Sequence, residues 1–206
     1  MKKIKTILIF LSFLLLLNSC NTIKGLFTSL DDFSNLKFKL GKVENFKVST
    51  IDISNISSTN SISATDVLIL TKSILNKQLP AEFTLNLLAN NPTNNNAKKQ
   101  SKAIIENLSW ILYIDDKETI NGIVNTPIQI LTGATSEIPV QINLDLYKFF
   151  SDKGYDDLMN MALAIGGANG SSSRLKLKIK PTVQIAGVSF KYPNYITVVE
   201  KEFRSK

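Results

Sequence analysis

The chain has 206 residues, of which 44% are apolar, so it is long enough for one globular domain with an appendage and too apolar to be disordered. It has no histidine and one cysteine, which excludes a histidine-dependent serine triad, an intrachain disulfide and a cysteine-based zinc site. The 24 basic and 17 acidic side chains give a formal charge of +7, and without Lys2, Lys3 and Lys5 it is +4, too small a surplus to indicate nucleic-acid binding.

Residues 1–19 have the composition of a signal peptide. The apolar run from Ile7 to Leu17 would form a helix of only about 16 Å, too short for a hydrocarbon core of about 30 Å. It therefore predicts an export signal and not a retained membrane helix. The alternative is an ordinary secreted protein in which Cys20 has no role.

The sequence Leu17-Asn18-Ser19-Cys20 resembles a bacterial lipobox, with Leu at position minus three and a small residue at minus one. The resemblance implies cleavage between Ser19 and Cys20, acylation of Cys20 and permanent anchoring through its acyl chains. Asn21 after the cysteine favours the outer membrane, and the lack of an acidic cluster there favours its periplasmic face. We expect residues 20–34 to be a lipidated tether.

We expect the domain to span residues 35–206. Its first part is predicted to contain two strands and a helix. Leu36–Leu40 and Phe46–Ile53 alternate between apolar and polar residues, and a shift between Val48 and Ile51 suggests a bulge. Asp66–Asn76 changes to helical spacing, with Thr65 or Asp66 as the cap.

Glu82–Ala89 predicts a strand with one buried face, ending at the turn Asn90-Asn91-Pro92. Pro92 has no N–H for a ladder, and asparagine side chains can bond their own backbone in a turn. The following lysines, Lys98, Lys99 and Lys102, are either a patch for lipid headgroups or polyanions or, more simply, a solvated loop tip.

Ala103–Asp115 predicts a long strand with Leu108, Trp110, Leu112 and Ile114 on one face and Ile105 on the other. Adjacent carboxylates at Asp115-Asp116 have two interpretations, a metal or acid/base site and a hairpin turn, and the turn is the simpler one. In the returning strand, Thr119–Val124, Gly122 predicts a bulge or a close approach.

The last part of the chain alternates between strands and helices. Ile138–Leu144 predicts a strand, Asp145–Ile165 two helical pieces, and Gly166-Gly167 a C-cap. Lys176, Lys178 and Lys180 alternate with apolar residues and predict the wet face of an edge strand. Two more strands are expected at Val183–Val188 and Ile196–Phe203.

About seven short strands with wet and dry faces predict a mainly β, antiparallel sandwich. The order of elements also resembles the type-2 late embryogenesis abundant family, known too as the water stress and hypersensitive response domain. The motifs that carry this resemblance are Phe83-Thr84-Leu85-Asn86-Leu87 leading to Asn91-Pro92, Leu112-Tyr113-Ile114-Asp115, Gly122, and Glu137-Ile138-Pro139-Val140-Gln141-Ile142. The third position of the family's Asn-Pro-Asn is Thr93 here.

Family resemblance implies an immunoglobulin- or fibronectin type III-like sandwich over about residues 46–202, with added helix near residues 147–165. It implies a structural role for Asn91, Pro92, Gly122 and Pro139, an association with stress protection, and no catalytic residues. No cofactor or metal is expected.

Three functions are consistent with the sequence. The first is a non-enzymatic envelope lipoprotein that acts as an interaction or stress-protection module. The second is binding or transfer of a lipid or other hydrophobic ligand, in a pocket lined by Phe149, Phe150, Met159 and Met161, although such residues are more often core. The third is an enzyme that uses the carboxylates of Asp115, Asp116, Asp156 and Asp157.

Overall fold

The structure is a computed structural model that describes residues 36–93, 102–168, 174–185 and 188–200. The strands are β1 (Lys37–Val48), β2 (Ile51–Asp52), β3 (Pro80–Asn90), β4 (Ala103–Ile114), β5 (Lys117–Val124), β6 (Ile128–Ile130), β7 (Thr135–Asp145), β8 (Leu175–Ile185), β9 (Val188–Lys191) and β10 (Ile196–Val198). The helices are the 3-10 turn η2 (Thr59–Ser61), α3 (Ala64–Leu75), α4 (Leu146–Phe150) and α5 (Tyr155–Gly166). The chain is mainly β, as predicted.

The first sheet has the order β2-β1-β3-β7, and every pairing in it is antiparallel. β3 lies in its centre and pairs with β7 without a break from Pro80↔Asp145 to Asn90↔Thr135. The predicted inner face of β3 is confirmed, because Phe83, Leu85, Leu87 and Ala89 are all buried. An 11-residue strand spans about 36 Å, so β3 runs along most of the domain.

The second sheet has the order β10-β8-β4-β5, with β6 paired to β4 and β9 paired to β8. The prediction of β8 as an edge strand was wrong, because β4 covers one of its edges and the short strands β9 and β10 cover the other. Alternating lysines reveal that one face of a strand is wet, and they carry no information about its edges. Both faces and both edges must be known before a strand can be placed in a sheet.

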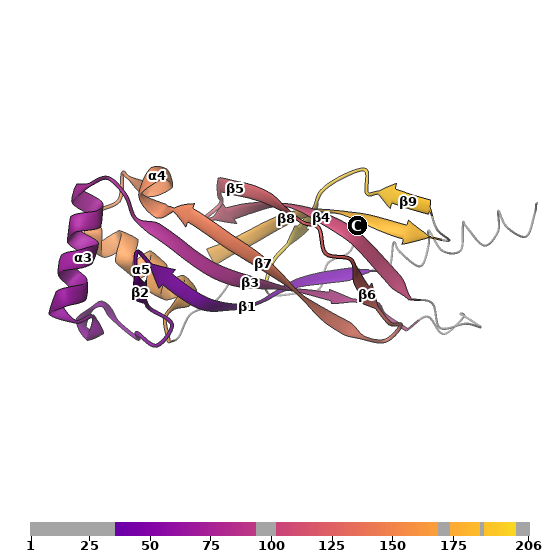
Figure 1. Cartoon of the computed structure of the whole chain (residues 1–206), viewed down its shortest axis with the longest axis horizontal. Helices are drawn as coiled ribbons and strands as arrows, with labels where there is room; N and C mark the ends of the chain where they lie inside the picture. The colour runs from indigo at the N-terminus through magenta and orange to yellow at the C-terminus, as the bar shows by residue number, and fades with distance from the viewer. Residues whose placement is uncertain (1–35, 94–101, 169–173, 186–187, 201–206) are drawn as a thin grey trace, which may run out of the picture.

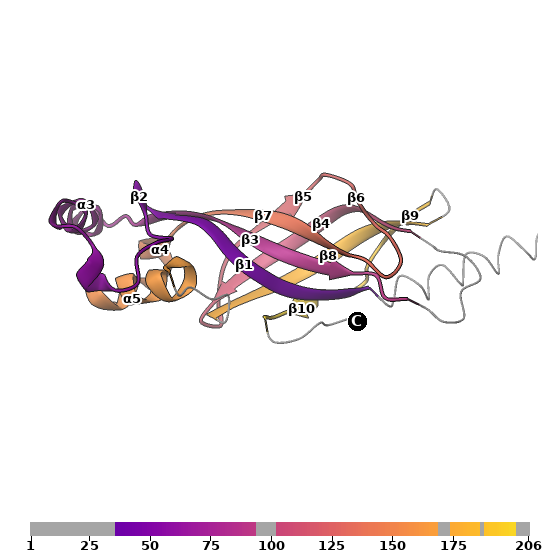
Figure 2. The same cartoon turned by 90° about the horizontal axis from the view of Figure 1, so that it is seen from below.

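The two sheets share one hydrophobic core, which is a single cluster with inner-face residues from both. Leu85 and Leu87 of β3 and Leu108 and Leu112 of β4 are fully buried in it. Each such side chain contributes about 1.5–3 kcal/mol through the water-exposed area that it loses. The domain is elongated, and α3, α4 and α5 lie together at one end, opposite the start of β1 (Figures 1 and 2).

The predicted bulge between Val48 and Ile51 is a hairpin turn. β1 and β2 pair at Lys47↔Asp52 and Val48↔Ile51, and Ser49 has a φ of 56°, which a tight turn requires. The two irregularities of β1 lie earlier, at Leu40/Val43 and Glu44/Lys47. A two-residue turn and a bulge shift the apolar pattern in the same way, so the sequence could not separate them.

A bulge in β4 changes the predicted face of Ile105. The register with β8 shifts between Ile105 and Asn107, so Ile105 is buried on the same side as Leu108. The predicted close approach at Gly122 is confirmed. Gly122 pairs with Trp110, and a Cβ added there would lie 2.4 Å from Trp110 Cζ2. The register shift in this hairpin lies elsewhere, between Ile111 and Tyr113.

The helices form where predicted, with different ends. α3 is capped by Ser63 and not by Thr65 or Asp66: Ser63 Oγ accepts from Asp66 N at 3.1 Å and donates to Asp66 Oδ2 at 2.7 Å. α5 ends at Gly166-Gly167, but Gly167 has a φ of −72°, so it is not a left-handed cap. Packing requires a glycine at position 166, because a Cβ on Gly166 would lie 1.6 Å from Phe46 Cδ1.

Candidate functional site

Several predicted site residues lie outside the described part of the chain. These are Ser19 and Cys20, the rest of residues 1–35, and Lys98 and Lys99 in residues 94–101. Lys102 is described and exposed. Within the described residues, no helix has both the length and the apolar character needed to cross a membrane.

Asn91 is a buried polar residue that fastens the turn after β3. Its Nδ2 donates to Ile130 O at 3.1 Å, its backbone N donates to Ala134 O at 3.0 Å, and its O accepts from Gly133 N at 2.6 Å. The side chain bonds a carbonyl far along the chain, whereas the sequence suggested a bond to its own backbone. These bonds join the end of β3 to β6 and to the β6–β7 loop, residues 131–134.

Pro139 lies on β7, opposite Asn86. In the described sheet β7 is the edge strand next to β3, and an edge is where a strand tolerates a residue without an N–H. Its side chain is exposed.

The four candidate carboxylates do not form one site. Asp115 and Asp116 are the β4–β5 turn, with φ of 47° and 64°, and they pair with Arg174, directly before β8, and with Lys176 on β8. Asp156 and Asp157 are exposed in the first turn of α5, where carboxylates favour the helix dipole. No group of three or more metal-ligating side chains is found in the residues that the structure describes.

The residues proposed for a hydrophobic pocket belong to the core instead. Met159, Met161 and Phe150 are buried to 3% exposure or less in the same cluster as the sheet residues, and Phe149 packs against that cluster. Such packing agrees with the simpler interpretation, that Met and Phe residues at helical spacing belong to the core. The groove described next does not include any of them.

An open groove of about 940 Å³ runs beside the middle of β1. Its floor is β1 from Lys39 to Asn45, and its other lining residues are Asp52, Ser54, Asn55, Leu88, Gly166, Gly167, Ala168 and Glu200. Three distant parts of the chain thus meet there: the segment after β2, the end of α5 and the segment after β10. The composition of the segment after β2 predicted only a loop, so no pattern in the sequence indicated the groove.

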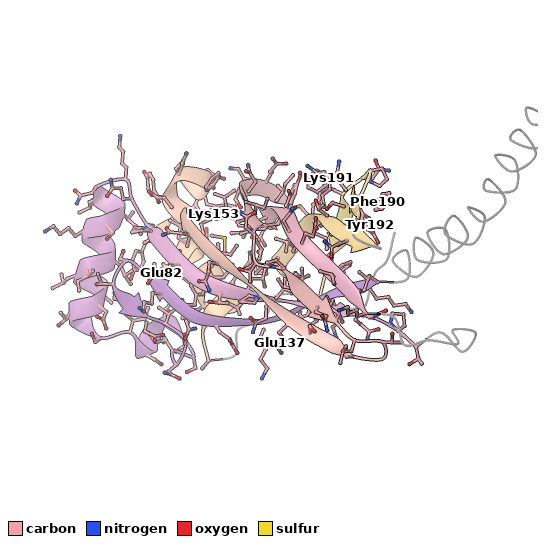
Figure 3. All side chains as sticks on the ribbon, turned by 45° about the vertical axis from the view of Figure 1, so that its right-hand side comes forward. Glu82, Glu137, Lys153, Phe190, Lys191 and Tyr192 are labelled. Atoms are coloured by element: carbon pink, nitrogen blue, oxygen red, sulfur yellow. The ribbon has the colours of Figure 1, made fainter. Side chains whose placement is uncertain are left out.

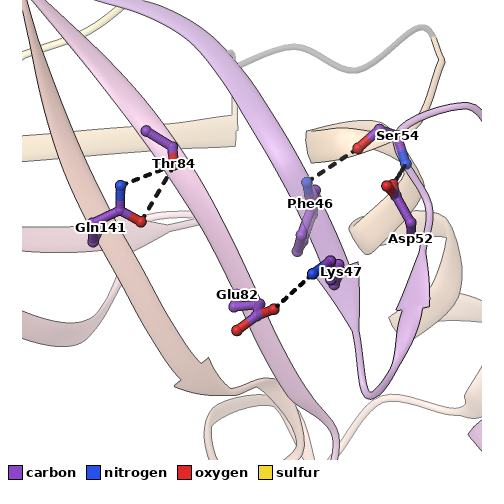
Figure 4. Close-up of polar contacts among 7 residues, drawn as sticks. All are labelled: Phe46, Lys47, Asp52, Ser54, Glu82, Thr84 and Gln141. Carbon is purple, nitrogen blue, oxygen red and sulfur yellow. Dashed lines mark hydrogen bonds and ion pairs between the residues drawn. The ribbon is translucent and has the colours of Figure 1, made fainter.

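Among the residues that the structure describes, the edge of β1 that faces this groove has no backbone partner in its middle and is held at both ends. Val199 O accepts from Leu40 N at 3.1 Å at one end. At the other end Phe46 N donates to Ser54 Oγ at 3.1 Å (Figure 4). Phe46 O also accepts from Ile53 N at 3.0 Å. Among the described strands only β2 pairs with this edge, and only at Lys47 and Val48.

The charges around the groove are mixed. Lys39 and Lys42 line it together with Glu44, Asp52 and Glu200. Hydrogen bonds from the backbone and side chain of Ser54 lower the pKa of Asp52, so this carboxylate is charged and fixed in place at neutral pH (Figure 4). The groove therefore offers backbone groups and both signs of charge, which suits an extended peptide better than a single ion.

The face of the sheet next to the groove is polar, and its side chains bond one another across the strands. Thr84 on central β3 is only 8% exposed because β1 and β7 flank it. It donates to Gln141 Oε1 at 3.3 Å and accepts from Gln141 Nε2 at 3.2 Å, and Lys47 pairs with Glu82 at 3.4 Å (Figure 4). The latter pair is exposed and contributes about 0–1 kcal/mol, so these contacts fix register more than they stabilise.

No family model matches the chain, and no curated protein matches it. One solved structure that is similar, titled "Crystal structure of protein from Archaeoglobus fulgidus", has 9% sequence identity over 82% of this chain and 98% of its own, with a TM-score of 0.34.

Proposed function

We propose that the protein is a membrane-anchored envelope lipoprotein whose β-sheet domain is a non-enzymatic interaction or stress-protection module. The anchor is supported by the leader and by the position of the one cysteine, Cys20, directly after Leu17-Asn18-Ser19. The observation that carries the interaction role is the open edge of β1 beside a groove of about 940 Å³.

An open strand edge offers N–H and C=O groups that can pair with an extended segment of another protein. In β1 this edge extends from Leu40 to Phe46, and its two irregularities, with a φ of 55° at Asn45, interrupt regular pairing. They disfavour pairing with a long flat strand, and so protect the chain from aggregation. The partner we propose is a short extended segment of an envelope protein, held by a few backbone hydrogen bonds and by the mixed charges of the groove.

The type-2 late embryogenesis abundant family and its immunoglobulin- or fibronectin type III-like sandwich remain our proposal for ancestry. Two antiparallel sheets around one core support it, as do Asn91, Gly122 and Pro139 in structural positions. The proposed location is the outer membrane, facing the periplasm.

The anchor is tested by mass spectrometry of the mature N-terminus from native envelopes. We expect a peptide that begins at Cys20 and carries acyl chains, and a Cys20→Ser chain that is released from membranes. An unmodified Cys20 in the membrane-extracted protein would disprove the lipoprotein assignment.

The groove is tested by placing a photo-crosslinking amino acid at Lys42, on the groove floor, and irradiating native envelopes. The matched control site is Asn143, which is exposed on the outer face of β7. We expect one stoichiometric adduct from position 42, none from position 143, and loss of that adduct when Asn55→Trp fills the groove. Equal adducts from both positions, or an adduct that is insensitive to Asn55→Trp, would contradict binding in the groove.

A further inference from the structure

Charged side chains are distributed unevenly along the long axis of the domain. We call one end the loop end: there Lys37, Asn90 and Thr135 are neighbours in the first sheet, and Ala103 pairs with Ile130 in the second. We call the other end, which carries α3, α4 and α5, the helix end (Figure 1). Asn91 connects the two sheets at the loop end through its bonds to residues 130–134.

The loop end is basic. Lys37 begins β1, Lys102 directly precedes β4, and Lys191 ends β9; all three are exposed. None of the three ion pairs recorded among the described residues uses them. Figure 3 shows Lys191 beside Phe190 and Tyr192 at this end, with Glu82 toward the other.

The helix end, in contrast, has most of the acidic side chains of the described residues. They are Asp52, Asp66, Glu82, Asp115, Asp116, Glu118, Asp145, Asp152, Asp156 and Asp157. Lysines there are interspersed with these carboxylates, and the recorded ion pairs lie on that side. An anionic surface would therefore attract the loop end more strongly than the helix end.

A large apolar side chain projects from the loop end. Leu131 is 59% exposed in the short loop between β6 and β7. This loop is held by Ala134 N donating to Leu131 O at 3.0 Å and Gly133 N donating to Asn91 O at 2.6 Å. An exposed apolar side chain at an end that also carries exposed lysines has the chemistry of a headgroup-level anchor, in which the apolar group enters the lipid and the amines meet phosphates.

The position of the N-terminal attachment agrees with this charge distribution. Leu36, the first described residue, is buried, and β1 begins directly after it at the loop end. Fifteen residues, 20–34, span at most about 50 Å. The end of the domain that such a tether joins is the end that first meets the membrane.

We propose that the loop end, through Lys37, Lys102, Lys191 and Leu131, binds the anionic phospholipid headgroups of the membrane that holds the chain's own anchor. This proposal rests on the proposed acylation of Cys20. The anchored domain would then have a fixed orientation, with its loop end against the membrane and α3 at the end away from it.

The test uses the mature, acylated chain in vesicles of phosphatidylcholine with or without phosphatidylglycerol. Acylated Cys20 has no free thiol, so Leu131→Cys provides a unique site for a nitroxide label, and Leu75→Cys, at a residue 77% exposed on α3, provides the matched control. Collision rates with oxygen and with a polar nickel complex then report how close each label is to lipid.

We expect the label at position 131 to become lipid-accessible in anionic vesicles and the label at position 75 to remain aqueous. Combined Lys37→Gln, Lys102→Gln and Lys191→Gln should reduce the ratio of bound to detached loop ends by up to about a hundredfold, and high salt should act in the same direction. The control triple variant at the helix end, Lys72→Gln, Lys77→Gln and Lys153→Gln, should not change it.

A label at position 131 that stays as aqueous as the one at position 75 would overturn the proposal, as would lipid contact that ignores the loop-end lysines. These results differ from a failure of the anchor. In that case Cys20 itself would react with the label and the chain would not float with vesicles.

Discussion

The two ends of the domain are closed by different kinds of interaction. At the helix end α5 packs directly on β1, with Gly166 against the ring of Phe46, and that ring lies 4.8 Å from the ring of Phe83. At the loop end the sheets are joined by hydrogen bonds of Asn91. The stability of the helix end therefore depends on the volume of the side chains packed there. The stability of the loop end depends on hydrogen-bond donors and acceptors.

The largest effect should come from Gly166→Ala at the helix end. Alanine in a helix is normally favoured over glycine by about 1 kcal/mol, but here its Cβ would lie 1.6 Å from Phe46 Cδ1 and 2.5 Å from Phe46 Cβ. We expect α5 to shift and the free energy of unfolding to fall by about 3 kcal/mol, measured by urea denaturation.

The control for this substitution is Gly154→Ser at the start of α5, where an added Cβ has nothing within 4 Å. A serine at this N-cap supplies a side-chain acceptor, so stability should be unchanged or rise by up to about 1 kcal/mol. In a Phe46→Ala background the further loss from Gly166→Ala should be smaller, because Phe46 Cδ1 and Cγ, the two atoms nearest the added Cβ, are absent. Equal stability of the Gly166→Ala chain and the natural chain would show that the helix end does not depend on volume.

A smaller loss is expected from Asn91→Ala at the loop end. The substitution leaves Ile130 O without the amide donor that lies 3.1 Å away, in a site only 6% exposed. A buried carbonyl without its donor costs about 1–3 kcal/mol. We expect a loss of about 2 kcal/mol in urea denaturation and faster hydrogen exchange at the Gly133 amide.

Asn90→Ala is the matched control for the loop end. Its amide bonds Thr135 Oγ1 at 2.9 Å and Ala134 O at 3.3 Å, but it lies at a more exposed position. Its loss should stay below about 1 kcal/mol, because water can replace the partners. If the two asparagines were equivalent, the burial of Asn91 would not be what secures this end.

The alternation of apolar residues was sufficient to predict β3, β4 and β7, since each has a continuous buried apolar face, although Thr84 and Asn86 on the other face of β3 are buried too. It failed where two structures give the same pattern, as at the Val48–Ile51 hairpin that imitates a bulge. It also failed for the position of β8, because pairing partners are set by contacts between distant segments. The groove beside β1 was not predicted for the same reason: its walls come from three parts of the chain that no local pattern connects.

The smallest expected effect distinguishes the ends by pH. Burial raises the pKa of Tyr192 to about 12, against about 10 in the unfolded chain. Because the folded state favours the neutral phenol, its contribution to stability is complete below pH 10 and is lost as the pH rises from about 10 to 12. Tyr192 lies toward the loop end, where its N donates to Pro181 O, so alkali should weaken this end first (Figure 3).

Urea midpoints from neutral pH to about pH 11 should therefore fall less steeply for Tyr192→Phe than for the natural chain. A shift of about two units corresponds to at most about 2.7 kcal/mol, and we expect about 1 kcal/mol because part of the ring remains in water. Tyr195→Phe, at a residue 44% exposed, is the control and should keep the natural slope. Lysine deprotonation is common to all three chains, so only the difference in slope is informative. Parallel curves for all three would mean that the phenol of Tyr192 ionises as readily in the folded domain as in the unfolded chain, and that the loop end has no titratable weakness of its own.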